Sequence, residues 1–462
     1  MRATFSDLLP EHLLSDDPAD LLTYGQDYMK RLPAAASLVL FPEETSHVEA
    51  IIRRCNERRI ALIPSGGRTG QTGATAACKG EVILSLQRMR RIFEVRETER
   101  SLHCQAGVTI QEIQEKARSN ELYFPVDYAS KGSAQIGGGI ATNAGGIHVM
   151  KYGNIRNWVL GVDVVSGAGE RLRLNRRLIK NNTGYDLRSL FIGSEGTLGV
   201  VTEATLLLTS PPGDIIRVFC ALDTLTSVLP LLKAVRAFAS ELSVFELITG
   251  DVLQKVIPHQ KLTPPFDCEY PYYALLEFEG MNPVRLEAYE NALGRIFESG
   301  IVKDMIISQN SKQAETLLAY REKIPSTLAE LHRQHKYDIS VPVESVIDFI
   351  SELNVLLERS FPQYRSVLFG HVADGNLHVN ILKPSEQAVD EFYAFCPKID
   401  DKVYGLIEKF EGSIAAEHGV GLLKKDALHF SRSGIEMDLM RQMKKVFDPN
   451  GILNPGKIFD LK

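Results

Sequence analysis

The sequence predicts an α+β fold in two large parts, followed by a short helical segment at the C-terminus. The first 210 residues are rich in glycine and in short apolar runs typical of strands, with a few helical patterns between them. After the double proline of TSPPGD, residues 209–214, longer helical stretches alternate with strands. The chain closes with a helical pattern and a Pro- and Gly-rich tail. We therefore expect three regions, residues 1–210, 211–425 and 426–462.

Strands of the first region are expected where apolar runs are bounded by turn residues, at residues 36–42, 60–67, 80–86, 101–108, 157–167 and 198–208. Helices are expected at residues 46–58 and 109–120. In the first of these, Val48, Ile51, Ile52 and Cys55 recur at helical spacing and predict one buried face.

The second region has longer helical patterns. They lie at residues 225–240, 284–300, 311–324 and 343–360, and they alternate with strand patterns at residues 271–280, 365–372 and 377–383. The last helical pattern, residues 434–448, belongs to the C-terminal segment. Both large parts are therefore expected to be α+β.

Composition and length exclude several classes of protein. At 462 residues the chain is too long for one ordinary core. A net charge of −6 without a basic stretch makes nucleic acid a poor partner. The six cysteines form no C-x-x-C pair, which argues against an iron–sulfur cluster, a zinc ribbon or a disulfide framework. Without a secretory signal or a transmembrane stretch, a cytoplasmic protein is expected, with any membrane contact being peripheral.

Three glycine-rich loops are candidates for ligand binding. They are residues 64–74 (PSGGRTGQTGA), 135–146 (QIGGGIATNAGG) and 193–199 (GSEGTLG). Glycines let backbone N–H groups approach an anion closely, although a glycine cluster alone is more often a mobile surface loop. Three such loops in one region favour a long, folded ligand with phosphates at one end. The glycines match neither the dinucleotide fingerprint nor the P-loop, so another binding mode is expected.

Residues 370–380, GHVADGNLHVN, carry two histidines around an Asp-Gly turn signal. A two-residue loop at Asp374 and Gly375 would place His371 opposite His378, close enough for both imidazoles to bind one ion. A cross-strand pair sharing a proton or a water is the equally weighted alternative for these residues alone.

The segment AAEHGVG supplies Glu417 and His418, an adjacent acid and base. Two histidines and one carboxylate form a three-ligand set that leaves coordination positions open, as in catalytic zinc sites. The same set also suits ferrous iron, so ligand type does not identify the metal.

Six motifs together resemble the FAD-linked oxidases of the vanillyl-alcohol-oxidase type. They are PSGGRTGQTG, GGGIATNAGG, GYDLRSLFIGSEGTLGVVTEA, GHVADGNLHVNILKP, AEHGVGLLKKDAL and DPNGILNPGKIF, which occur in the family's order from about residue 35 to the end. Within that group they are most similar to D-2-hydroxyglutarate dehydrogenases, with D-lactate dehydrogenases and the catalytic subunit of glycolate oxidase as near relatives. The resemblance implies a two-part FAD-binding domain of the PCMH type and a substrate (cap) domain with an antiparallel sheet. The C-terminal helical segment would complete the flavin site.

The resemblance also implies how FAD is held. The residues it assigns to the cofactor are Ser65, Gly66, Gly67, Arg68, Thr69, Gly70, Gly73, Pro125, Gly138, Thr142, Asn143, Gly145, Gly146, Glu195, Gly196, Gly199, Val200 and Asn454. Residues 65–70 with Gly73 would bind the pyrophosphate, and the residues from Pro125 to Gly146 would line the flavin channel. Relatives that bind FAD covalently have a histidine where this chain has Arg68, so non-covalent FAD is expected.

For the second site, the resemblance implies a divalent metal at His371, His378 and Glu417. Zinc is the favoured ion, with cobalt or manganese as alternatives. Arg321, Lys336 and Asn380 would bind the substrate, and His418 would contact it as the catalytic base. A fourth metal ligand or a packing residue is the alternative reading of His418. Pro325 stands where D-2-hydroxyglutarate dehydrogenases often have Thr or Ser.

The expected activity is oxidation of a D-2-hydroxy acid to the 2-oxo acid by hydride transfer to flavin N5. D-2-hydroxyglutarate is the first choice of substrate, and D-lactate, D-malate or glycolate are the alternatives. A non-catalytic flavin-binding subunit is the alternative from another class. Electrons would pass to an electron-transfer flavoprotein or a quinone. A homodimer is one assembly that the sequence allows.

Overall fold

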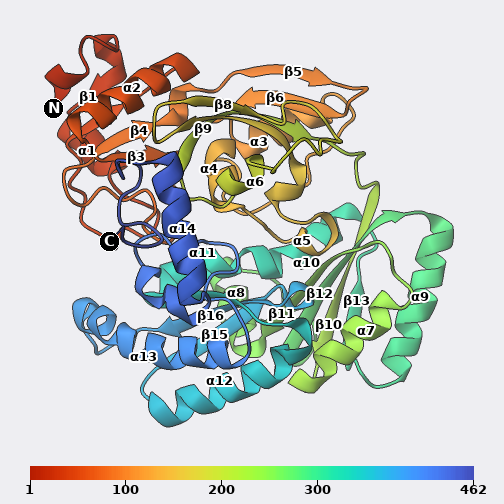
Figure 1. Cartoon of the computed structure of the whole chain (residues 1–462). Coiled ribbons are helices and arrows are strands. Elements are labelled where there is room, and N and C mark those ends of the chain that lie inside the picture. The colour runs from red at the N-terminus through yellow and green to blue at the C-terminus, as the bar shows by residue number, and fades with distance from the viewer. Residues whose placement is uncertain (462) are drawn as a thin grey trace. The chain divides into compact units, whose positions relative to one another are not determined.

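The computed structural model describes residues 1–461 and divides them into two compact units (Figure 1). Unit 1 consists of Met1–Gly146, Tyr152–Pro211 and the chain from Glu417 onward. Unit 2 consists of Ile147–Lys151 and Pro212–Ala416. Both contain helices and sheets, which confirms the predicted α+β class.

Unit 1 is built on two sheets. The four-stranded sheet has the order β1-β2-β4-β3, in which β4 pairs in parallel with both β2 and β3. The five-stranded sheet has the order β5-β6-β9-β7-β8 and is antiparallel. The strands are β1 (Leu14–Ser15), β2 (Leu38–Leu40), β3 (Leu62–Ser65), β4 (Val82–Ser85), β5 (Ile92–Arg96), β6 (Ser101–Gln105), β7 (Val159–Ser166), β8 (Arg171–Leu174) and β9 (Gly199–Leu207).

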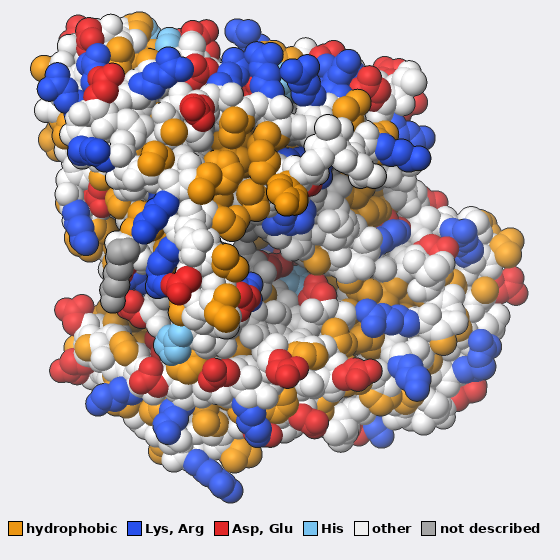
Figure 2. Space-filling view, viewed as in Figure 1, with side chains coloured by type: hydrophobic (Ala, Val, Ile, Leu, Met, Phe, Trp, Pro, Cys, Tyr) orange, Lys and Arg blue, Asp and Glu red, His pale blue; other side chains and the backbone are white. Residues whose placement is uncertain are grey.

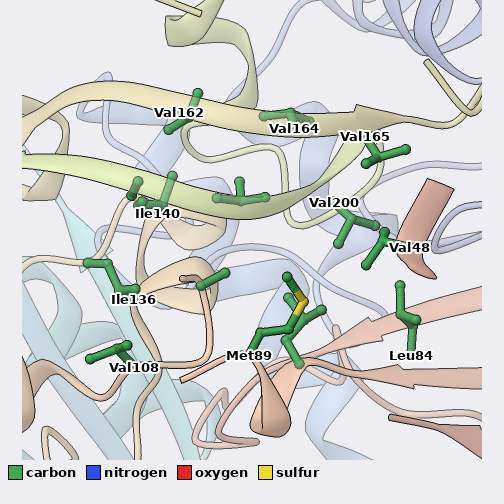
Figure 3. Packing of buried hydrophobic residues seen from close by; sticks show 14 of the residues in the cluster. Val48, Leu84, Met89, Val108, Ile136, Ile140, Val162, Val164, Val165 and Val200 are labelled. Atoms are coloured by element: carbon green, nitrogen blue, oxygen red, sulfur yellow. The ribbon is translucent and has the colours of Figure 1, made fainter. Parts of the chain in front are cut away.

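The α-helices of unit 1 are α1 (Pro18–Tyr24), α2 (Thr45–Arg58), α3 (Ile110–Arg118), α4 (Ile136–Thr142), α6 (Arg188–Phe191) and α14 (Gly434–Phe447). The expected apolar face of α2 is buried through Val48, Ile51, Ile52 and Cys55. Val48 packs with side chains of β4, α4, β7 and β9 in one hydrophobic core, part of which is drawn in Figure 3. This core places the glycine-rich loop after β3 beside α4.

Unit 2 is built on one antiparallel seven-stranded sheet with the order β13-β10-β12-β11-β15-β16-β14. Its strands are β10 (Asp214–Leu222), β11 (Leu242–Thr249), β12 (Tyr272–Met281), β13 (Asp304–Ile307), β14 (Gln334–Ser340), β15 (Arg365–Gly370) and β16 (Asn376–Leu382). The antiparallel sheet expected for the second region is therefore present.

Helices cover this sheet. They are α7 (Val228–Arg236), α8 (Gly250–Gln260), α9 (Pro283–Glu298), α10 (Ser311–Glu322), α11 (Ile324–Leu331), α12 (Val346–Ser360) and α13 (Val389–Lys409), and the short α5 (Val149–Tyr152) begins in the segment of residues 147–151. Side chains of α8, α10 and α11 pack with Ile248 and Phe369 on one face of the sheet. Figure 1 shows α12 and α13 on the other side of the sheet.

The predicted two-residue hairpin between β15 and β16 is wrong. The last paired residues are Phe369 and His378, so His371 lies in the connection rather than opposite His378. The His371 carbonyl accepts hydrogen bonds from the N–H groups of Asp374 and Asn376, which closes a longer turn. Gly375 has a φ of 83°, and a Cβ there would lie 2.1 Å from the Val341 carbonyl oxygen. Packing against the Val341 backbone therefore selects this turn, and the local Asp-Gly signal did not predict it.

Within residues 1–461, no helix combines the length and the apolar character that crossing a membrane requires. Lys and Arg side chains are interspersed with Asp and Glu side chains over the face drawn in Figure 2.

Candidate functional site

The glycine-rich loops of unit 1 converge on the end of β3. A Cβ on Gly66 would lie 3.5 Å from Gln135 Oε1 and 3.7 Å from Gly138 Cα. A Cβ on Gly196 would lie 3.4 Å from both Pro64 and Asn454 Nδ2. Three sequence-distant loops and the C-terminal tail therefore surround Pro64–Gly66, as a ligand contacted by all of them requires.

Several buried polar atoms at this convergence have no hydrogen-bond partner among the described residues. They are Ser65 Oγ, Gln135 Oε1 and Asn454 Oδ1. Leaving a buried polar group unpaired costs free energy, so these atoms indicate a missing partner. Gly138, in the first turn of α4, has open space where a Cβ would project. The donor and acceptor atoms and the space both fit an elongated polar ligand.

The other predicted residues of the first loop are held in place by neighbours in unit 1. Arg68 has a positive φ of 55°, and its guanidinium carbon lies 4.4 Å above the Tyr24 ring centroid. The N–H of Gly73 donates to Asp27 Oδ2 at 2.8 Å. Burial raises the pKa of the Asp27 carboxyl. The hydrogen bonds that it accepts from the N–H of Gly73 and from other backbone N–H groups only partly offset this rise. Thr69 and Gly70 complete the loop, and the Gly70 carbonyl accepts from the Tyr28 N–H at 3.2 Å.

The predicted flavin-channel residues lie around the C-terminal end of α4. Thr142 donates its hydroxyl to the Gly138 carbonyl at 3.1 Å, and Asn143 ends the helix with a left-handed φ of 50°. Gly145 and Gly146 follow, and Pro125 is buried in the preceding segment. A Cβ on Gly146 would lie 1.9 Å from the Asp127 carbonyl oxygen, so the two segments are in close backbone contact.

The predicted cofactor residues of the third loop have structural partners. Glu195 accepts hydrogen bonds from the N–H groups of Val420 and Gly421, both at 2.8 Å. Burial raises the pKa of Glu195, and these N–H groups only partly offset the rise. Asn454 donates its amide to the Glu195 carbonyl at 2.6 Å. Gly199 and Val200 begin β9, where Val200 is in the hydrophobic core (Figure 3).

His418 is attached to the first glycine-rich loop. Its Nε2 lies 3.4 Å from the amide nitrogen of Gln71, and its carbonyl oxygen lies 3.4 Å from Thr72 Oγ1. The Thr72 carbonyl in turn accepts from the N–H groups of Leu422 and Leu423. Glu195 and Thr72 thus hold the turn that carries His418 beside the loop of residues 65–73.

In unit 2, polar side chains share one face of the sheet at β14 and β16. Lys336 pairs with Asn380, and Asp338 pairs with His378. Paired residues of adjacent strands project from the same face. This face therefore carries Lys336 and Asn380, which were predicted to contact the substrate, and His378, which was predicted to bind the metal.

A buried carboxylate orients His371. Glu246, on β11, is fully buried and accepts from Nδ1 of His371 through one oxygen and from Nε of Arg321 through the other. Burial raises the pKa of Glu246, but the positive charges of Arg321 and His371 lower it by more, and the net shift is downward. Glu246 is therefore a carboxylate that fixes both side chains.

His378 has a carboxylate on the same ring nitrogen. Its Nδ1 lies 3.8 Å from Asp338 Oδ1, which also accepts from the Asn376 amide at 3.0 Å. The ring centroids of His371 and His378 are 5.4 Å apart, and their candidate ligand nitrogens lie within 4.8 Å of each other. A carboxylate at one nitrogen of each imidazole is the arrangement that orients metal-binding histidines in proteins.

The predicted substrate residues lie on this face as well. Arg321 is buried, and its guanidinium carbon lies 4.8 Å above the Phe369 ring centroid. Burial lowers the pKa of Lys336. Asn380 is 3% exposed, and its amide nitrogen has no hydrogen-bond partner among residues 1–461. A buried amide donor without a partner indicates that this face binds an acceptor from outside the chain.

Glu417 is the first residue of unit 1 after the last crossing of the chain. The N–H of the preceding Ala416 donates to the Asp338 carbonyl at 3.3 Å, and Ser413 and Ser340 exchange two further backbone bonds. The residue before Glu417 is therefore fixed on β14, next to Asp338.

Sequence reasoning missed Glu246 and Asp338. Glu246 interrupts the apolar run LSVFELIT of residues 242–249, and an acidic residue inside a buried strand is the signal that could have revealed it. Asp338 lies two residues after Lys336, on the same face of β14.

Two family profiles match the chain. FAD linked oxidases, C-terminal domain, matches residues 212–458, and FAD binding domain matches residues 36–175. The D-2-hydroxyglutarate dehydrogenase of Stutzerimonas stutzeri (strain A1501) is 44% identical over 443 residues, covering 96% of this chain and 95% of that protein. The mitochondrial D-2-hydroxyglutarate dehydrogenase of Rattus norvegicus is 35% identical, covering 98% of this chain and 84% of that protein.

The fold is also found in solved structures. P-cresol methylhydroxylase with substrate bound superimposes with a TM-score of 0.77 at 16% identity, covering 100% of this chain and 96% of that one. An alkyldihydroxyacetonephosphate synthase superimposes with a TM-score of 0.74 at 17% identity, covering 98% of this chain and 85% of that one. At such identity these two structures establish the fold alone.

Proposed function

The chain belongs to the family of FAD-linked oxidases, and from that premise we propose that it is an FAD-dependent dehydrogenase that oxidises D-2-hydroxyglutarate to 2-oxoglutarate. Relatives named D-2-hydroxyglutarate dehydrogenase, similar over nearly the whole chain, support this substrate. One structural observation carries the proposal. Arg321 stacks on Phe369, and Lys336 and Asn380, whose amide nitrogen has no partner among residues 1–461, share the sheet face of His378.

The binding of FAD is supported by the converging loops of unit 1. The N–H groups of residues 65–70 and Gly73 would hold the pyrophosphate, while Ser65 Oγ, Gln135 Oε1 and Asn454 Oδ1 offer hydrogen-bonding atoms. FAD, when bound, accepts the hydride from C2 of the substrate. Arg68 in place of a histidine supports non-covalent binding. The remaining predicted cofactor residues, among them Glu195 and Gly199, are proposed to shape this site.

We propose that His371, His378 and Glu417 hold a divalent metal, with zinc as the preferred ion. Two observations support it: both imidazoles have a carboxylate at Nδ1, and the residue before Glu417 is hydrogen-bonded to Asp338. The donor set of two nitrogens and one carboxylate suits zinc and leaves coordination positions open. The ion would supply Lewis acidity toward substrate oxygens.

A substrate with two carboxylates needs two cationic partners. Arg321 is held by Glu246 through Nε alone, which leaves the terminal nitrogens of its guanidinium to bind a carboxylate as a fork. Lys336 supplies a second positive charge, and Asn380 donates a hydrogen bond from the paired position on β16. Pro325 supplies no hydroxyl at the start of α11, so recognition of the two carboxylates would fall to these three side chains.

His418 is the proposed base. Oxidation at C2 requires loss of the hydroxyl proton, and a neutral imidazole nitrogen accepts it. Gln71 and Thr72 fix the position of His418 beside the first glycine-rich loop. His418 would thus take up the hydroxyl proton as C2 is oxidised.

We further propose that an electron-transfer flavoprotein or a quinone reoxidises the flavin, that the protein works in the cytoplasm, and that it forms a homodimer.

We propose that residues 1–210 bind FAD, that residues 211–425 bind substrate and metal, and that residues 426–462 complete the flavin site. The match of the two family profiles to residues 36–175 and 212–458 supports the first two of these regions.

A dye-reduction assay on a panel of D- and L-2-hydroxy acids tests the proposal. Turnover with D-2-hydroxyglutarate, and slower turnover with D-lactate, D-malate and glycolate, is expected. Preference for D-lactate, D-malate or glycolate would reassign the substrate. Absence of turnover with every acid would indicate a non-catalytic flavin-binding subunit.

A further inference from the structure

A cavity of about 870 Å³ lies at one end of three neighbouring strands of unit 2. Its walls are formed by α8, by the end of α11 and the residues that follow it, and by the chain at the starts of β14 and β15 and the end of β16. The volume falls within the roughly 300–1,000 Å³ typical of pockets for small ligands. None of its lining residues belongs to the proposed FAD, metal or substrate sites. The cavity is therefore a candidate for a separate ligand.

Strand pairing brings three basic residues together at this cavity. Arg365 at the start of β15 pairs with Leu382 at the end of β16, and Leu382 also pairs with Gln334 at the start of β14. The N–H of Lys383 donates to the Arg333 carbonyl at 2.9 Å. Arg333, Arg365 and Lys383 therefore lie next to one another across the strands, and all three line the cavity.

Three of the lining cations have no acidic partner. Within residues 1–461, no ion pair or side-chain hydrogen bond joins Lys255, Arg333 or Arg365 to another residue. Lys255, on α8, also acts on His332 in the same cavity. Burial lowers the pKa of His332, and the positive charge of Lys255 lowers it further. Cations gathered without counterions repel one another, and an anion bound among them would offset that repulsion.

The acidic residues of the cavity do not balance these charges. Four Lys or Arg side chains line it, against two glutamates. Glu330 has a different basic partner, since its Oε2 lies 2.7 Å from His259 Nε2. Glu386 accepts the Ser385 hydroxyl at 2.8 Å. The charge of the lining is therefore positive overall, which favours an anionic ligand.

Part of the lining is apolar. It includes Ala329, Leu331 and Pro384, and Leu331 is 44% exposed. Lys383 holds the loop that contributes Pro384, because its Nζ donates to the carbonyls of Pro384 and Gln387 at 2.6 and 2.7 Å. Covering an exposed leucine removes apolar surface from water. The lining therefore favours a ligand with an organic part as well as anionic groups.

The cavity is separate from the side chains proposed to bind metal and substrate. Arg365 lies four residues before Phe369 on β15, and Leu382 lies four residues after His378 on β16. At about 3.3 Å per residue, the two ends of these strands are about 13 Å apart. A ligand in the cavity would therefore not occupy the substrate site.

We propose that this cavity binds an organic polyphosphate of about the size of a nucleotide. Arg333 and Arg365 would each bind phosphate oxygens through paired N–H groups, and Lys255 would supply a third positive charge. Three separate cations suit a chain of phosphates, and the organic part would cover Leu331. The site is additional to the proposed dehydrogenase site and does not depend on that activity.

Isothermal titration calorimetry with ATP tests the proposal, on the full chain with its bound FAD and no free nucleotide. One ATP per chain should bind. Arg333→Ser/Arg365→Ser should lower the affinity by about tenfold or more, because two sets of charge-assisted hydrogen bonds are lost. Both arginines are exposed, so the melting temperature should stay the same.

Arg295→Ser/Lys312→Ser is the matched control. It removes two exposed positive charges of unit 2 that lie outside the cavity lining. Its affinity for ATP should change by less than about twofold, because exposed charges at a distance are screened by salt.

Two comparisons test the parts of the ligand. Arg333→Lys/Arg365→Lys should bind ATP with intermediate affinity, because it keeps the charges and loses the paired N–H groups. Inorganic tripolyphosphate should bind more weakly than ATP, because it leaves Leu331 uncovered. Equal affinity for tripolyphosphate and ATP would overturn the organic part of the assignment.

Absence of ATP binding, or an equal loss of affinity in the control variant, would overturn the proposal. Release of FAD by ATP, seen as a change in flavin fluorescence, would also overturn it, since ATP would then occupy the flavin site. Displacement of ATP by D-2-hydroxyglutarate would assign the binding to the substrate site and overturn it as well. Absence of turnover with every 2-hydroxy acid would refute the proposed function and leave this titration decisive.

Discussion

His371 and Arg321 share one carboxylate, that of the fully buried Glu246. The imidazole is bound through Nδ1 and the guanidinium through Nε. One acidic side chain thus orients a proposed metal ligand and a proposed substrate-binding cation. Loss of its charge should affect both functions together.

Glu246→Gln should lower metal affinity by about 10- to 100-fold, because an amide orients and polarises the imidazole less well than a carboxylate. Metal content by mass spectrometry and FAD content by absorbance measure the effect, and FAD should be retained. Glu352→Gln, at an exposed ion pair of the same unit, is the control. Wild-type metal content in Glu246→Gln would contradict the proposed role of His371.

Asn380→Leu should separate stability from substrate binding. The buried amide nitrogen has no partner in the described chain, so its replacement removes a desolvation penalty of about 1 kcal/mol or more. The melting temperature should therefore stay the same or rise, while KM for D-2-hydroxyglutarate rises. A lower melting temperature with unchanged KM would show that Asn380 has a structural role only.

Gly138→Ala tests the proposed position of FAD. Gly138 lies in α4 with open space at the Cβ position, so alanine should stabilise the helix by roughly 1 kcal/mol. If FAD occupies that space, the added methyl group should weaken FAD binding measured by fluorescence titration. Gly294→Ala in α9 also has open space and should leave FAD affinity unchanged. Equal FAD affinity in both variants would place the cofactor elsewhere.

Lys457 should make stability depend on pH in the alkaline range. Burial lowers its pKa to about 8, whereas the unfolded chain has the ordinary value of 10.5. The unfolded state therefore binds more protons between these values, and stability rises with pH from about 8 to 10.5. In the wild type this rise in the free energy of unfolding should reach up to about 3 kcal/mol, and in Lys457→Met it should be absent. Chemical denaturation across that pH range measures it. An unchanged pH slope would show that Lys457 is not the group responsible.

The helices and strands with strong periodicity were predicted well. The pattern of residues 46–58 corresponds to α2, and the run of residues 198–208 corresponds to β9. Their burial pattern is local and therefore readable from sequence. The family motifs also identified the glycine-rich loops, which the structure brings together at the end of β3.

The features that were missed depend on contacts between distant segments. The hairpin at residues 370–380 was predicted wrongly because the Val341 backbone constrains Gly375, and that contact has no local signal. Glu246 is 125 residues from His371, so their interaction could not be inferred from spacing. The contact of His148 with Glu277 likewise joins residues 129 positions apart in the sequence.

Anaerobic addition of D-2-hydroxyglutarate to the purified FAD-loaded protein tests the central claim most directly. The oxidised-flavin absorbance should be lost with the D-enantiomer and change little with the L-enantiomer. It should also change little in His378→Ala, although FAD is bound. Bleaching by the L-enantiomer at an equal rate, or by the D-enantiomer in His378→Ala at the wild-type rate, would contradict the claim.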